Sequence, residues 1–279
     1  TASCPPENIY VVTHENYRNL VLKQLPDVDP AKVLYEPVRR NTAPCIAYAC
    51  HKIAVENPAA NIVVAPSDHI ILREDVFTSV INLALGASEK NDWLITLGIT
   101  PSRPDTGYGY IQFNDSVSLG PEGRLNKVIT FTEKPQYDLA VKFLQSGDFL
   151  WNSGIFIWSV KSILQAFEKH LPEVDSLFRE GIKIYGTPAE KEFVNKAYTL
   201  CKSISIDYGV MEKADNVYVV AADFGWSDLG TWSSLYDARQ KNDHGNSIQG
   251  ANVLTWETQN SIILIPGDKV AVIDGLNDY

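Results

Sequence analysis

The sequence predicts an α/β fold in which helices cover both faces of a β-sheet. Short runs rich in β-branched and aromatic residues indicate strands, and amphipathic segments with helical periodicity separate several of them. Such alternation is typical of an α/β sheet. The strand-like runs are residues 8–13, 32–37, 61–66, 93–99, 108–113, 127–135, 153–160 and 216–224. The helical segments are residues 15–24, 43–55, 74–89, 137–146, 161–167 and 189–200.

The last part of the chain differs from the rest because it lacks helical periodicity. Residues 246–279 contain only short strand-like runs. We therefore predict a main domain of residues 1–245 and the start of a β-rich C-terminal extension at residues 246–279. The chain opens on an interior strand and closes one turn after another strand, so we expect the natural protein to continue at both ends.

Charge and composition exclude several classes of function. The net charge of -10 disfavours sequence-independent binding of nucleic acid, which requires a basic surface. No apolar run approaches the ~20 residues that span a bilayer, so we expect no membrane association. The cysteines fit neither a zinc site nor a disulfide framework, so we expect reduced thiols in a cytoplasmic protein. They are Cys4, Cys45, Cys50 and Cys201.

Two aspartates follow predicted strands, at the sheet edge where α/β proteins bind ligands. Asp68 comes after residues 61–66, and Asp228 lies in a segment rich in glycine and tryptophan. Two carboxylates together with phosphate oxygens suit magnesium, so we predict a Mg²⁺ site. The alternative for each aspartate is a helix cap, Asp68 for a helix starting near Glu74 and Asp228 for one over residues 235–240. We expect His69 to be a structural histidine.

Glu133 and Lys134 end another predicted strand. Because adjacent strand residues point to opposite faces, we expect no simple ion pair between them along one face. The Glu133 carboxylate suits the hydroxyls of a sugar, and Lys134 suits a phosphate. An exposed charged turn is the alternative.

Three further segments carry polar groups suited to a sugar. Asn152 lies beside apolar strand residues, and a buried amide without partners costs roughly 1–3 kcal/mol, so we expect it to have fixed partners. Asp207 lies at a further strand exit. Gly107 and Tyr108 belong to a glycine-rich turn whose backbone groups can approach a polar ligand, although a plain hairpin turn is the alternative.

Glu36 precedes Arg40, Asn41 and Thr42, and we expect Thr42 to be the N-cap of a helix starting at Pro44. Amide groups at that helix start would hold a base or a phosphate. A carboxylate only accepts hydrogen bonds, and guanine offers two neighbouring donors on its Watson–Crick edge. If this segment holds a base, guanine is therefore the best match.

The segments EPVRRNTAP, APSDH, TGYGYI, FTEKP, WNSGIFIW, IDYGVME and WSDLGTW, taken in this order, resemble the mannose-1-phosphate guanylyltransferases of the sugar nucleotidyltransferase superfamily. The resemblance implies a three-layer Rossmann-like fold with a mixed sheet and a catalytic domain over residues 1–245. It also implies a reaction in which GTP and mannose 1-phosphate give GDP-mannose and pyrophosphate, with Mg²⁺ as cofactor. The family's glycine-rich phosphate loop is missing here, and we expect it to be a mobile segment of the natural protein. A truncated, inactive protein is the alternative.

The same resemblance assigns roles to individual residues. It implies that Asp68 and Asp228 bind the metal, and that these two residues and Lys134 are catalytic. The implied nucleotide-binding residues are Glu36, Arg40, Asn41, Thr42 and Ser67. The implied sugar-binding residues are Gly107, Tyr108, Glu133, Asn152 and Asp207.

Other functions remain open at this level. A glucose-1-phosphate thymidylyl- or uridylyltransferase shares the chemistry, although Glu36 disfavours it. A non-catalytic nucleotide-sugar sensor is a second alternative. A glycosyltransferase is disfavoured because its usual DxD motif is absent from the PSDH segment. A homodimer formed through the β-rich tail is open as well.

Overall fold

The computed structural model describes residues 4–119 and 125–279. The chain divides into two compact units, each built from two stretches of sequence. Unit 1 contains Thr1–Pro66 and Arg73–Phe224, and unit 2 contains Ser67–Leu72 and Gly225–Tyr279. Unit 2 thus begins before the predicted extension, and the division of the catalytic domain at residue 245 stays a prediction.

A six-stranded sheet forms the centre of unit 1, in the order β3-β8-β5-β9-β7-β6. The neighbours β5 and β9 run parallel, whereas β8 pairs antiparallel with both β3 and β5. The predicted mixed sheet is therefore confirmed. The strands are β3 (Asn61–Val64), β5 (Leu94–Ile99), β6 (Gly109–Leu119), β7 (Leu125–Glu133), β8 (Phe149–Ser159) and β9 (Val217–Ala221).

The two remaining predicted strands form a separate parallel pair, β1 (Val11–His14) with β2 (Val33–Glu36). Short helical segments lie before β1 and between the two strands. These are η1 (Pro6–Asn8), η2 (Glu15–Tyr17), α1 (Arg18–Gln24) and η3 (Pro30–Lys32).

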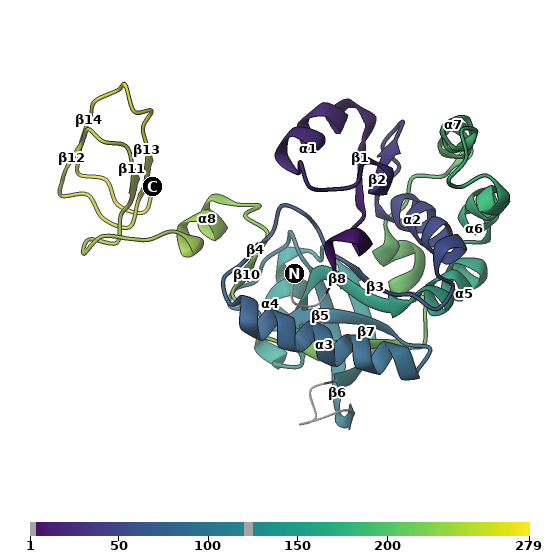
Figure 1. The fold of residues 1–279 in the computed structure, drawn as a ribbon. Coiled ribbons are helices and arrows are strands. Elements are labelled where there is room, and N and C mark those ends of the chain that lie inside the picture. Colours follow the sequence, from purple (N-terminus) through teal and green to yellow (C-terminus); the bar gives the residue numbers. More distant parts are fainter. Residues whose placement is uncertain (1–3, 120–124) are drawn as a thin grey trace. The chain divides into compact units, whose positions relative to one another are not determined.

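Helices cover both faces of the six-stranded sheet, which makes unit 1 a three-layer structure as predicted (Figure 1). Successive strand residues face opposite sides of a sheet. Phe156 and Trp158 join a buried cluster with residues of α2 (Thr42–Glu56) and α5 (Val160–His170), while the alternate residues of β8 face α3 (Glu74–Lys90). The remaining helical elements of unit 1 are α4 (Tyr137–Ser146), α6 (Pro172–Arg179), η5 (Glu180–Lys183), α7 (Glu190–Leu200) and the π-helix η6 (Asp207–Met211).

All six predicted helices are present, but α6 was not predicted. One residue, Leu171, separates it from α5. Pro172 occupies its first position, where the backbone N–H that proline lacks would have no partner within the helix. Within residues 4–119 and 125–279, every helix falls short of the length and hydrophobicity needed to cross a membrane. All four cysteines lie in this part of the chain and are free thiols, as expected.

Unit 2 contains an antiparallel pair of two-residue strands and a set of parallel ones. β4 (Ile70–Ile71) pairs with β10 (Trp226–Ser227), and α8 (Trp232–Ala238) follows. In the C-terminal set, the first two strands each pair in parallel with a strand that comes one coil later, as in a β-solenoid. The predicted β-rich extension is therefore confirmed. The pairs are β11 (Ser247–Gln249) with β13 (Ile262–Leu264), and β12 (Val253–Trp256) with β14 (Ala271–Asp274).

The packing around Gly98 in β5 yields a stability test. A Cβ atom at this position would lie 2.6 Å from Leu150 Cδ1 and 2.7 Å from Val219 Cγ2. We expect Gly98→Ala to lower the free energy of unfolding by about 1–3 kcal/mol, the usual cost of overpacking. Gly86 in α3 has no atom within 4 Å of the same position, so Gly86→Ala should raise it by about 0.5–1 kcal/mol. Urea unfolding checks both, and equal effects of the two variants would contradict the packing argument.

Candidate active site

Asn152 of β8 lies at the centre of a polar cluster in unit 1. Its Nδ2 donates to Asp207 Oδ1 over 3.0 Å. Its Oδ1 accepts hydrogen bonds from Thr96 Oγ1 at 3.0 Å and from the Gly154 amide at 3.2 Å. The prediction that Asn152 has fixed partners is confirmed, and its carboxamide therefore holds Asp207 in one orientation.

Glu133 completes this cluster at the end of β7. It lies opposite Gly109 in the β6–β7 pair, and a Cβ atom at residue 109 would collide with Glu133 Oε2. Burial raises the pKa of Glu133, and the neighbouring Asp207 carboxylate raises it further. Burial also raises the pKa of Asp207. This residue opens the π-helix η6 after α7, so the predicted strand exit at Asp207 is wrong. Two carboxyl groups are thus held close together in a partly dry environment.

The expectation about Glu133 and Lys134 is wrong, because Lys134 Nζ lies 3.4 Å from Glu133 Oε1. Lys134 has a φ of 47°, in the left-handed region, so it no longer follows the alternation of a strand. Its side chain therefore turns towards that of its neighbour. It is 63% exposed, so the ammonium group remains accessible to a ligand.

The glycine-rich turn lies beside this ion pair. The Lys134 amide donates to the Tyr108 carbonyl at 3.2 Å, and the Gly107 amide donates to Asp105 Oδ1 at 2.8 Å. Tyr108 is buried against the edge of Trp151, with ring centroids 4.9 Å apart. The structure thus brings all of the predicted sugar residues together. It adds Thr96 and Asp105, whose roles depend on contacts that the sequence does not display.

Glu36 ends β2, and its Oε1 atom is buried without a hydrogen-bond partner among the described residues. Burial raises its pKa. The Tyr198 hydroxyl lies near this carboxyl group but outside hydrogen-bonding geometry, and it too has no partner in the described part of the chain. An acceptor buried in this way is costly unless a ligand supplies donors.

The residues that follow Glu36 are engaged with the protein. Helix α2 begins at Thr42 and its N-cap is Asn41, whose Oδ1 accepts from the Thr42 amide at 2.9 Å. The predictions of Thr42 as N-cap and of a helix start at Pro44 are therefore wrong. Asn41 is the cap because its short side chain reaches the Thr42 amide, and asparagine tolerates the positive φ of 67° better than most residues. Arg40 Nε donates to the Tyr198 carbonyl at 3.0 Å.

Asp68 and Asp228 lie together in unit 2, at the same end of the β4–β10 pair. Ser227 is opposite Ile70, so in continuing register Asp228 comes opposite His69. Burial lowers the pKa of His69, while both carboxylates act against that shift. Trp226 Nε1 donates to His69 Nδ1 at 3.0 Å, which is the structural role expected of this histidine.

Neither aspartate caps a helix. The N-cap of α3 is Arg73 and that of α8 is Thr231, while Asp228 Oδ1 accepts from the Gly230 amide at 3.0 Å. No group of three or more His, Cys, Asp or Glu residues suited to a metal occurs in residues 4–119 and 125–279. Two carboxylates fit a cation that takes its other ligands from substrate oxygens and water, as magnesium does. Ser67, exposed beside Asp68, also belongs to unit 2, whereas the other predicted nucleotide residues belong to unit 1.

Comparison with known proteins gives the family. The family model for nucleotidyl transferases matches residues 3–244. The chain belongs to the nucleotidyl transferase family. A Sinorhizobium fredii protein named mannose-1-phosphate guanylyltransferase is 36% identical over 274 residues, 95% of this chain and 52% of its own length. The Pseudomonas aeruginosa alginate biosynthesis protein AlgA is 35% identical over 274 residues, 96% of this chain and 55% of its own length.

The chain thus spans about half the length of the curated relatives that it matches. Among solved structures, a Thermus thermophilus protein described as a mannose-1-phosphate geranyltransferase superposes with a TM-score of 0.78 and 27% identity, over 99% of this chain and 79% of the other. The resemblance inferred from the sequence motifs is confirmed. So is the nucleotidyltransferase-like fold.

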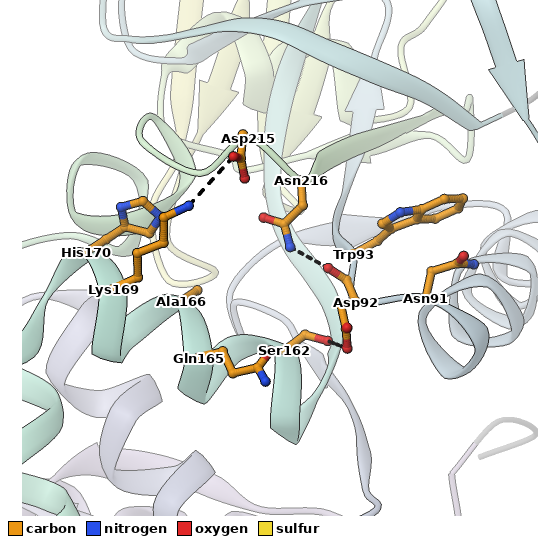
Figure 2. A pocket seen from close by; sticks show the side chains of 10 residues that line it. All are labelled: Asn91, Asp92, Trp93, Ser162, Gln165, Ala166, Lys169, His170, Asp215 and Asn216. Atoms are coloured by element: carbon orange, nitrogen blue, oxygen red, sulfur yellow. Dashed lines mark hydrogen bonds and ion pairs between the residues drawn. The ribbon is translucent and has the colours of Figure 1, made fainter.

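A second polar region of this nucleotidyl transferase lies beside the amino ends of β5 and β9, in a cavity of about 410 Å³ (Figure 2). Its polar groups contact one another: Lys169 Nζ lies 3.6 Å from Asp215 Oδ2, and Ser162 Oγ donates to Asp92 Oδ1 at 3.4 Å. Asn216 Nδ2 donates to the Asp92 carbonyl. None of the predicted site residues lines this cavity. The contacts between its lining residues join α5 to the starts of β5 and β9.

The raised pKa of Glu133 predicts a pH-dependent effect of Glu133→Gln on stability. A carboxyl group with a raised pKa in the folded state stabilises the fold below its ordinary pKa, and that contribution is lost as pH rises through the raised value. Glutamine stays neutral, so the variant should gain stability relative to the wild type between pH 4 and pH 8. Urea unfolding at both pH values measures the difference.

Glu192→Gln is the matched control, because Glu192 is exposed on α7 and should change stability little at either pH. A Glu133→Gln variant whose advantage is the same at pH 4 and pH 8 would show that Glu133 is not held in a dry environment.

Proposed function

We propose that the protein transfers GMP from GTP to mannose 1-phosphate, giving GDP-mannose and pyrophosphate. The observation that carries the proposal is the partly buried Glu133–Asn152–Asp207 cluster at one end of the sheet in a nucleotidyl transferase. Its carboxylates are fixed acceptors for sugar hydroxyls, and Lys134 beside it is a cation for the sugar phosphate. The names of the relatives support mannose as the sugar.

Guanine is proposed as the base because of Glu36. Its buried Oε1 atom lacks a donor among the described residues, and guanine would supply two adjacent ones. Uracil and thymine present no such pair of donors. A hydrogen bond from the base to Glu36 Oε1 would remove the cost of a buried unpaired oxygen, about 1–3 kcal/mol. A base whose edge lacks such donors would not gain this energy.

The reaction requires positioning more than acid–base chemistry. A phosphate oxygen of the sugar phosphate forms a bond to the α-phosphorus of GTP, and the bond from that phosphorus to pyrophosphate breaks. A phosphate monoester is largely dianionic near pH 7, so its oxygen attacks without a general base. The repulsion between two anions is the main obstacle, and Lys134 offsets part of it. Glu133, Asn152 and Asp207 orient the sugar so that its phosphate is aligned.

Asp68 and Asp228 are proposed to hold Mg²⁺. When bound, the ion would neutralise phosphate charge and polarise the attacked phosphorus. The two aspartates would supply the carboxylate oxygens, and Trp226 fixes the neighbouring His69 through its indole hydrogen bond.

Pyrophosphate release tests the function. The natural full-length protein is incubated with Mg²⁺ and each combination of GTP, ATP, UTP or dTTP with mannose 1-phosphate or glucose 1-phosphate. We expect release with GTP and mannose 1-phosphate at a rate at least about tenfold above any other pair, the factor that ~1.4 kcal/mol of discrimination gives. Preference for UTP or dTTP would indicate the thymidylyl or uridylyl alternative, and no release with any pair would refute the proposal.

Asp228→Asn tests the metal site. We expect turnover to fall on the order of 100-fold, with a higher Mg²⁺ concentration needed for half-maximal rate, because a carboxylate ligand is replaced by a neutral amide. Asp243→Asn is the control, since Asp243 is an exposed residue in the same unit. Wild-type turnover and Mg²⁺ dependence in Asp228→Asn, with the far-UV spectrum of the wild type, would remove Asp228 from the site.

A further inference from the structure

The segment that follows Glu36 is hydrogen-bonded to the segment that leads to Asp207. The Ile204 amide donates to the Arg40 carbonyl at 3.2 Å, and the Ala43 amide donates to the Ile204 carbonyl at 3.1 Å. These two bonds lie on either side of Thr42 and join stretches of chain that are far apart in the sequence. The predicted base segment and the sugar segment are thus one connected piece of structure within unit 1.

The Thr42 hydroxyl supplies a third bond at this junction. Its oxygen accepts from the Ile206 amide at 2.8 Å. Thr42 is the first residue of α2, and its own amide is held by Asn41, so the hydroxyl projects from a fixed position. Ile206 is buried, and it directly precedes Asp207.

Asp207 is therefore fixed from two directions. Its carboxyl group is held by Asn152, as described above, and its main chain is held one residue earlier by Thr42. The π-helix that starts at Asp207 is an uncommon conformation that surrounding contacts must stabilise. The amide of residue 206 is the last backbone donor before that π-helix begins.

We propose that Thr42 is a positioning residue for the sugar site, acting through Ile206 on Asp207, and not a ligand of the nucleotide. This inference rests on the proposed function, because it assigns Asp207 to the sugar. It reassigns a residue that the motif resemblance places in the base site. Because of these hydrogen bonds, a change in the conformation of residues 40–43 would also move Asp207.

The test compares Thr42→Val, which removes the hydroxyl at nearly constant volume, with Thr42→Ser, which keeps it. We expect Thr42→Val to raise KM for mannose 1-phosphate about tenfold, the effect of losing ~1.4 kcal/mol, with KM for GTP changed less than about twofold. Thr42→Ser should stay close to the wild type. Thr199→Val is the control, since the Thr199 hydroxyl donates to the Asn195 carbonyl in its own helix at 2.8 Å.

An equal or larger rise in KM for GTP would make Thr42 a nucleotide ligand. If Thr42→Ser raised KM for mannose 1-phosphate as much as Thr42→Val, the hydroxyl could not be the cause of the effect. Hydrogen exchange of the Ile206 amide, measured without substrates, separates this inference from the proposed function. We expect exchange at least about tenfold faster in Thr42→Val. Unchanged exchange would overturn the positioning role. Faster exchange in a protein that releases no pyrophosphate would overturn the function and leave the Thr42–Ile206 contact standing.

Discussion

The hydrogen bond from Asn152 to Asp207 is the interaction on which the candidate active site depends. Asn152 is itself fixed by Thr96 and by its own strand, so the orientation of its amide follows from the pairing of β8 with β5. The central sheet thereby determines where a partly buried carboxylate points. Loss of this bond would leave the Asp207 carboxylate without its amide donor, at a cost of about 1.5–3 kcal/mol.

The same arrangement places stability and binding in opposition. Glu133 and Asp207 both have raised pKa values, so the folded protein carries an electrostatic cost at neutral pH. Glu36 adds a buried acceptor without a partner in the described residues. Such groups are expensive in the free protein and become favourable when a ligand brings hydroxyl or amide donors. Their cost in the free protein is a reason to assign them to ligand binding.

Much of the fold and of the site could be predicted from the sequence. Hydrophobic periodicity located the strands and most helices, and the rule that ligands bind at strand ends made Asp68, Glu133 and Asp228 candidates for the site. The errors concern backbone angles and distant contacts. Residue type does not reveal that Lys134 adopts a positive φ, so its ion pair was missed. Nor does it reveal that Thr42 meets a residue 164 positions away.

Unit 2 is assembled from two stretches of chain, residues 67–72 and 225–279, with most of unit 1 encoded between them. Strand β4 lies in the first stretch and its partner β10 in the second, and the Leu72 amide donates to the Gly225 carbonyl at 3.2 Å. A chain shortened to residue 224 would therefore keep a loop that has lost its partner. In evolutionary terms, this unit cannot be exchanged by replacing residues 225–279 alone, because any replacement must also match residues 67–72.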